Sequence, residues 1–123
     1  SVINIAPSDP KGPINLSAAL GGKGKYYEDE KQDLDNALKL FTESIALDSS
    51  NEETIWHLGT VNAKRANYTE SIKWFKRLTT IRPNDPTIWG GLEWAYSLAG
   101  DTANAAACRQ KAAQLTQQPT ETK

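Results

Sequence analysis

The sequence of 123 residues contains one cysteine, one histidine and no methionine. A single cysteine, Cys108, excludes an intramolecular disulfide and a cysteine-rich metal site. His57 is the only imidazole, and no nucleophile signature surrounds either residue. The glycine-rich residues 21–24 match no nucleotide-binding pattern. We therefore expect no enzymatic activity, no metal or other cofactor and no small-molecule substrate, and we interpret Cys108 as a small packing residue.

Long apolar runs and an excess of one charge are also missing. No stretch approaches the roughly 18 apolar residues of a membrane span, so direct membrane insertion is not expected. The formal net charge of −1 gives no general attraction to nucleic acid or anionic lipid. The nearest basic and aromatic group is Lys73, Trp74, Lys76 and Arg77. This group is more typical of a solvated helix face than of a nucleic-acid site.

The absence of methionine at the first position indicates a processed protein or an excised fragment. The compartment is not assigned by the sequence. A cytoplasmic location is slightly favoured, and a periplasmic or membrane-tethered one stays open if an N-terminal anchor was removed.

A repeat of 34 residues organises the rest of the chain. Apolar residues recur at spacings of two to four, and a shift of 34 residues brings the pattern back. The clearest series is Leu47, Ile81 and Leu115. Polar turns of four residues, at 48–51 and 82–85, separate the copies. Short turns of this kind leave consecutive helices antiparallel and adjacent.

The central copy, residues 52–85, predicts two amphipathic helices at 53–65 and 69–81. The third copy predicts a helix at 88–99 that ends at Gly100. The helix starts carry their own signals, because Asn51 and Asp85 are suitable N-caps and Pro86 suits a first helical position.

Both ends of the chain look less regular. Residues 1–16 hold three of the six prolines and no helical period, which predicts an extended or disordered arm. As an alternative, the arm lies along the first helix pair through Val2, Ile3 and Ile5. Residues 17–33 predict a weak first helix with a frayed or irregular start, because three glycines cost about 2–3 kcal/mol relative to alanine. We expect residues 119–123 to form a flexible tail.

Together these residues resemble the tetratricopeptide repeat, whose pattern is Trp-x2-Leu-Gly-x2-Tyr, then Ala-x3-Phe, then Pro. The central copy matches at Leu58, Gly59, Phe75 and Pro83. The third copy matches at Trp89, Leu92, Tyr96 and Ala105. The first copy matches at Ala37 and Phe41 and, with one residue inserted in its turn, at Leu20, Gly24 and Tyr27. The chain departs from the pattern at Ile55, Asn62, Ser71, Glu93 and Arg109.

The resemblance implies an all-α fold, an α-solenoid of three helix-turn-helix repeats in a right-handed superhelix. The repeats would cover about 17–51, 52–85 and 86–118 within one domain, 17–118. Small residues such as Gly59 and Ser71 would let two helices approach closely, while Leu58 and Phe75 fill the space between them.

The resemblance also implies a concave groove that is lined by the first helix of each pair and holds a partner peptide. The expected groove residues are Lys25, Glu28, Asp29, Glu53, Trp56, Thr60, Ala63, Lys64, Thr87, Gly90, Trp94, Ser97 and Leu98. Trp56 and Trp94 are the expected anchors, with the alternative that either ring packs on a neighbouring helix. Repeats that bind chaperone tails carry a clamp of Lys, Asn and Arg. This groove lacks that clamp, which favours a mixed apolar ligand.

We therefore predict a non-catalytic protein–protein interaction module, a scaffold or adaptor that binds a protein or peptide ligand. The alternative is a structural spacer or self-association module within a larger or membrane-anchored protein of the same class, forming a weak homo-oligomer.

Overall fold

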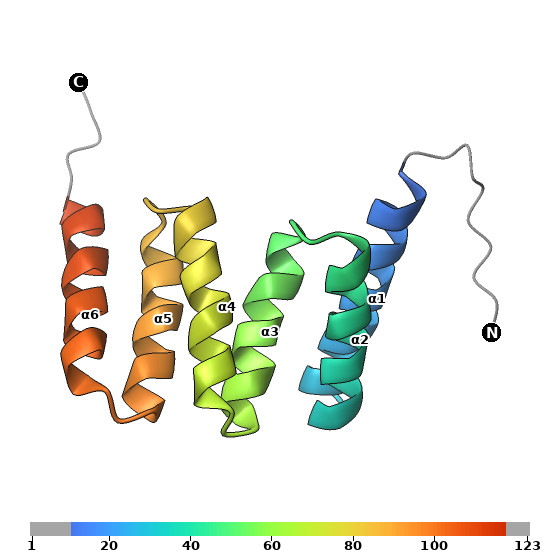
Figure 1. Cartoon of the computed structure of the whole chain (residues 1–123), viewed down its shortest axis with the longest axis horizontal. Helices are drawn as coiled ribbons and strands as arrows, with labels where there is room; N and C mark the ends of the chain where they lie inside the picture. Colours follow the sequence, from blue (N-terminus) through green and yellow to red (C-terminus); the bar gives the residue numbers. More distant parts are fainter. Residues whose placement is uncertain (1–10, 118–123) are drawn as a thin grey trace.

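A computed structural model describes residues 11–117, which form six α-helices and no strand within that range. The helices are α1 (Gly12–Asp29), α2 (Leu34–Leu47), α3 (Glu52–Lys64), α4 (Tyr68–Ile81), α5 (Pro86–Leu98) and α6 (Thr102–Gln117). They stand side by side in one array, with α1 and α6 at opposite ends (Figure 1). Each helix contacts the next one, and α3 also contacts α1 and α5. The predicted all-α array of three helix-turn-helix repeats is therefore confirmed, whereas the right-handed superhelical twist stays a prediction.

Within a repeat, glycine allows two helices to approach closely, as expected. A Cβ atom at Gly59 would lie 2.7 Å from the ring of Phe75, and one at Gly24 would lie 2.7 Å from the ring of Phe41. Both rings are fully buried. The Ser71 hydroxyl donates a hydrogen bond of 2.7 Å to the carbonyl oxygen of Gly59. Gly24 and Gly59 thus hold equivalent places once one residue is inserted in the first turn.

The helix ends use the predicted caps. The Asn51 side chain accepts a hydrogen bond of 3.2 Å from the backbone N–H of Thr54. Asp85 accepts one of 3.0 Å from the N–H of Thr87. Gly100 follows α5 with a φ of +81°, a left-handed conformation that glycine adopts without a Cβ penalty.

The first helix is longer and more regular than the sequence suggested. It begins at Gly12, so the predicted extended arm is wrong for residues 12–16, and it continues unbroken through the three glycines. Pro13 lies in the first turn, where a missing N–H costs no helical hydrogen bond. Gly21 and Gly24 face close neighbours, so tertiary contact offsets their weak helix propensity. Residues 1–10 of the arm and the tail 119–123 lie outside the described residues.

Two apolar clusters form the core. The first cluster consists of Ala37, Phe41, Leu58 and Val61. The second cluster consists of Ile55, Phe75, Leu78, Ile88, Leu92, Ala95 and Cys108. The partly buried Ile45 and Trp74 pack against both clusters, so the core is continuous along the array. Within residues 11–117, no helix has the length and apolar character needed to span a membrane.

Candidate interaction surface

The predicted groove residues lie on α1, α3 and α5, but only some of them are open to solvent. Glu28 and Ala63 are buried, and Trp56, Thr60 and Gly90 are partly buried. The exposed ones are Lys25, Asp29, Glu53, Lys64, Thr87, Trp94, Ser97 and Leu98.

Trp94 and Leu98 form an exposed apolar pair on α5. They are 39% and 42% exposed, and their spacing of four residues puts them on one side of the helix. The Trp94 ring meets the buried Phe75 ring edge to face, with centroids 6.4 Å apart. One side of the indole therefore rests on the core while another side faces solvent.

Trp56 has a different environment. Its ring packs edge to face on Phe75, with centroids 5.1 Å apart. A Cβ atom at Gly91 would lie 2.8 Å from the Trp56 ring, so α5 approaches this ring as closely as a glycine allows. The geometry favours the alternative stated for this residue, in which the ring packs against a neighbouring helix.

Glu28 makes internal contacts, which differ from the solvent-facing role expected for it. Its carboxylate is joined to His57 Nδ1 at 3.0 Å, to Thr60 Oγ1 at 2.7 Å and to Lys64 Nζ at 2.9 Å. The spacing of these three residues puts them on one side of α3, facing α1. The residue itself is only 3% exposed. Thus Glu28, Thr60 and Lys64, all predicted as groove residues, come together as an internal link between the first two repeats.

Burial alone would raise the pKa of Glu28, but the hydrogen bonds from His57, Lys64 and Thr60 outweigh it and lower this pKa to about 2. Because a carboxylate can only accept, the Nδ1 atom of His57 carries the proton in this contact. Phe41 stacks on the His57 ring, with centroids 5.2 Å apart. His57 was not among the predicted groove residues, although its spacing of three and seven from Thr60 and Lys64 was the available signal.

A second polar group lies at the same boundary between repeats. The hydroxyls of Ser17 and Ser44 each donate to the other residue's backbone carbonyl at 2.7 Å. Ser44 also shares a hydrogen bond of 2.8 Å with the Thr54 hydroxyl. Asn51 Nδ2 donates to the Ser17 hydroxyl at 3.0 Å. The two serines and Thr54 are buried, and all three of their hydroxyls have hydrogen-bond partners within the protein.

Other reactive side chains have packing roles. Cys108 is 5% exposed. Burial, and to a smaller extent the nearby charge of Glu93, raises the pKa of its thiol, so the thiol stays protonated at neutral pH. The Trp74 ring packs on both core clusters, so it is not an open platform for stacking a base. In the part of the chain that the structure describes, no group of three or more His, Cys, Asp or Glu side chains is arranged to hold a metal ion.

These features define an all-α helical-repeat solenoid in which Trp94 and Leu98 form an exposed apolar pair on α5. Solved structures share the fold. The crystal structure of MamA superposes with a TM-score of 0.70 at 22% identity, covering 81% of this chain and 58% of that one. A mutant of MamA gives a TM-score of 0.69 at 21% identity, covering 89% and 86%. The structure of MamA MSR-1 C2 gives 0.66 at 22% identity, covering 90% and 59%.

The chain therefore spans less than two thirds of two of these structures. No protein-family model matches the sequence, and no curated protein does. At identities near 22% the likeness concerns the fold alone.

Proposed function

We propose that the chain is a non-catalytic interaction module that holds an extended segment of a partner protein against the face of α1, α3 and α5. Trp94 and Leu98 are its anchors. The observation that carries this proposal is the exposure of two large apolar side chains one turn apart on α5. Exposed apolar patches mark interaction sites, and tryptophan is the side chain most often found as an energetic anchor in them.

The residues along this face indicate the chemistry of the ligand. The α5 end offers Trp94 and Leu98, whereas the α1 end offers the exposed charges of Lys25 and Asp29. Neighbouring packed helices lie about 8–10 Å apart, so a segment that crosses from α5 to α1 needs about six extended residues. We therefore expect a partner segment that is apolar at one end and polar at the other.

Two further observations support an interaction role. Solenoids of stacked helix pairs present extended concave surfaces, and this chain shares its fold with solved structures of that kind of architecture. The resemblance to the tetratricopeptide repeat assigns Trp94 and Leu98 to the groove side of the third repeat.

The test begins with peptides selected from a display library on the wild-type protein. Each selected peptide is then measured by calorimetry against Trp94→Ala combined with Leu98→Ala, after circular dichroism has verified the fold. Loss of the anchors should weaken binding about tenfold or more, which corresponds to 1.4 kcal/mol or more. Ile81→Ala is the matched control, because Ile81 is 40% exposed on α4, outside the predicted groove. Equal affinity for the groove variant and the wild type would contradict the proposal.

Self-association is the second candidate function. Ile14 and Tyr26 on α1 are 52% and 49% exposed at the other end of the array, where a second copy has apolar side chains to cover. Sedimentation analysis over a wide concentration range separates the two functions. A monomer at all concentrations would exclude stable self-assembly, whereas a dimer that Tyr26→Ser disrupts would support it.

A further inference from the structure

A hollow of about 300 Å³ lies between α4, α5 and α6. Lys76, Trp89, Leu92, Tyr96, Cys108 and Lys111 are among its lining residues. Leu92 and Tyr96 are each two residues from Trp94, and two residues turn a helix by about 200°. The hollow therefore lies on the side of α5 opposite the proposed groove, and nothing in the proposed function uses it.

The repeat explains why the hollow exists. A shift of 34 residues relates Cys108 to Trp74 in the second repeat. The Trp74 indole packs against both core clusters, which contain Ile55 and Leu58, the counterparts of Trp89 and Leu92. In the third repeat the small thiol of Cys108 leaves open the space that an indole occupies in the second.

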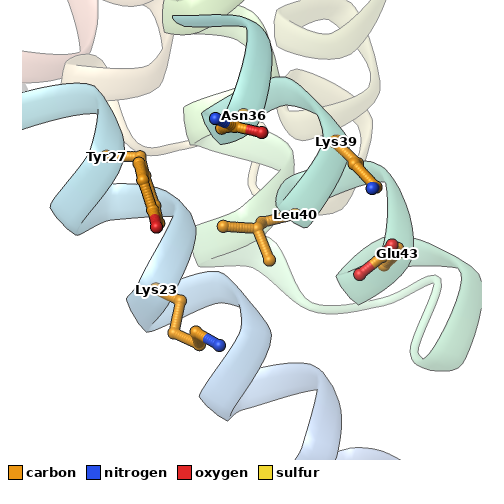
Figure 2. A pocket seen from close by; sticks show the side chains of 6 residues that line it. All are labelled: Lys23, Tyr27, Asn36, Lys39, Leu40 and Glu43. Carbon is orange, nitrogen blue, oxygen red and sulfur yellow. The ribbon is translucent and has the colours of Figure 1, made fainter. Parts of the chain in front are cut away.

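The first repeat offers a comparison at the equivalent place. Its hollow of about 220 Å³ is lined from α1 by Lys23 and Tyr27 and from α2 by Asn36, Lys39, Leu40 and Glu43 (Figure 2). Leu40 stands where the third repeat has Cys108, and it points from α2 toward Tyr27 (Figure 2). This hollow is partly filled by a leucine and carries charges of both signs.

The third-repeat hollow carries charge of one sign only. Lys76 and Lys111 line it, and no carboxylate does. Glu93 lies nearby, but it is paired with Arg109 at 2.8 Å. In the second repeat, Lys73 and Arg77 lie over the Trp74 ring, each 5.7 Å from its centroid. Lys111 is the counterpart of Arg77. The third repeat therefore also has a cation beside the position that the Trp74 ring occupies in the second repeat.

We propose that this hollow is a second docking site, which takes an aromatic side chain of a partner peptide whose neighbouring residues are acidic. The aromatic ring enters the space that corresponds to Trp74 and packs on Leu92 and Tyr96. The flanking carboxylates meet the ammonium groups of Lys76 and Lys111 at the rim. The site binds independently of the α1–α3–α5 groove, because the two surfaces lie on opposite sides of α5.

The test is an NMR titration of the ¹⁵N-labelled protein with a blocked Glu-Trp-Glu tripeptide, up to about 5 mM because a single-anchor peptide binds weakly. Shifts are expected at the Trp89 indole N–H and at the amides of Ala107 and Cys108, and none at the Trp94 indole. Glu-Ala-Glu should cause no shifts, and Lys-Trp-Lys should bind at least fivefold more weakly. Absence of shifts with Glu-Trp-Glu, or equal binding of Lys-Trp-Lys, would overturn the proposal. So would indole acetate that binds as tightly as the tripeptide, since the site would then take a free small molecule.

Variants locate the binding. Cys108→Trp supplies the ring from within the chain, as in the second repeat, and should abolish the shifts, whereas Trp94→Ala should leave them unchanged. Lys76→Glu combined with Lys111→Glu tests the same site without altering the core. This pair should weaken Glu-Trp-Glu at least tenfold and strengthen Lys-Trp-Lys. Unchanged peptide preference in this charge-reversal variant would overturn the proposal even if Cys108→Trp failed to fold.

Discussion

The boundary between the first two repeats and the boundary between the last two are built from the same backbone and different chemistry. We call them the first seam (α1 and α2 against α3) and the second seam (α3 and α4 against α5). In the first seam the buried hydroxyls of Ser44 and Thr54 share a hydrogen bond of 2.8 Å. The 34-residue shift replaces them in the second seam by Leu78 and Ile88, both members of the second cluster.

The same contrast recurs on the groove side. The Glu28 carboxylate holds His57, Thr60 and Lys64 together in the first seam. The counterparts of His57, Thr60 and Lys64 in the second seam are Gly91, Trp94 and Leu98. With one residue inserted in the first turn, the counterpart of Glu28 is Ala63. Charge in one seam is thus replaced by apolar and aromatic packing in the other.

This difference shows how a repeat array fixes the order of its units. The buried polar groups of the first seam have their hydrogen-bond partners on the neighbouring repeat. Against the apolar surface of the second seam these groups would be left without partners, which would lower the free energy of unfolding. The first repeat can therefore not replace the third without loss. Identical helix geometry does not make the repeats interchangeable.

The largest expected effect comes from giving the second seam a residue of the first. Leu78 is 1% exposed, and Leu78→Ser should lower the free energy of unfolding by about 3–5 kcal/mol through lost burial and a cavity. Urea unfolding followed by circular dichroism measures this loss. Adding Ile88→Thr supplies the partner hydroxyl, so the double variant should lose about 1 kcal/mol less than the sum of the single variants. Strict additivity would show that the hydroxyl pair does not form in this context.

Acid should weaken the first seam selectively. The folded-state pKa of Glu28 is about 2, below its ordinary value of 4.5. Above pH 4.5 the carboxylate is charged in both states and its stabilisation is complete. As the pH falls toward 2 the unfolded state gains a proton first, and about 2–3 kcal/mol is lost.

Glu28→Gln should therefore be less stable than wild type at pH 7 and nearly equal to it at pH 2.5 in urea unfolding. Glu53→Gln, at an exposed position on α3, is the matched control and should show little difference at either pH. A constant gap between wild type and Glu28→Gln at both pH values would contradict the assignment of the buried link.

A smaller effect is expected from the hydroxyls of the first seam. Ser44→Ala leaves the buried Thr54 hydroxyl and the Ser17 carbonyl without the Ser44 hydroxyl and should cost about 1–2 kcal/mol in thermal unfolding. Thr54→Val added to Ser44→Ala removes the unpaired hydroxyl and should recover about 1 kcal/mol of that loss, while the Ser17 carbonyl stays without the Ser44 donor. A double variant less stable than Ser44→Ala would show that the hydroxyls contribute more than mutual satisfaction.

The smallest effects concern helix glycines that face open space. A Cβ atom at Gly22 or at Gly90 would meet nothing within 4 Å, so Gly22→Ala and Gly90→Ala should each stabilise by about 0.5–1 kcal/mol. The adjacent Gly91 is the contrast, since its Cβ would lie 2.8 Å from Trp56 and 2.9 Å from Phe75. Differential scanning calorimetry should show Gly91→Ala lowering the melting temperature. If Gly91→Ala raised the melting temperature as much as Gly90→Ala, the helices of the second seam would be less closely packed than the contacts at Gly91 indicate.

Much of the fold was accessible from the sequence, because helix periodicity, caps and glycine contacts are local or repeat at a fixed interval. Asn51, Asp85, Gly59 and Ser71 all have their predicted roles. The regularity of α1 through Gly21 and Gly24 was not accessible, because what offsets these glycines is contact with α2 and α3 rather than local propensity.

The site was only partly predictable for a related reason. The groove positions of a repeat family fall on the correct helices, but exposure depends on what each neighbouring repeat presents. Glu28 is buried because α3 supplies three donors for it, and Thr60 is partly buried beside it, whereas Trp94, the counterpart of Thr60, stays exposed. A residue's place in the repeat therefore predicts the surface it belongs to but not whether a ligand can reach it.

The hydrogen-bonded first seam has a consequence for how the array responds to cold. Stabilisation by apolar burial weakens on cooling, and the second seam depends mainly on such burial. Hydrogen bonds of hydroxyl and carboxylate groups supply a larger part of the stabilisation of the first seam. The second seam thus loses the larger share of its stabilisation in the cold, and the relative stability of the two seams changes with temperature.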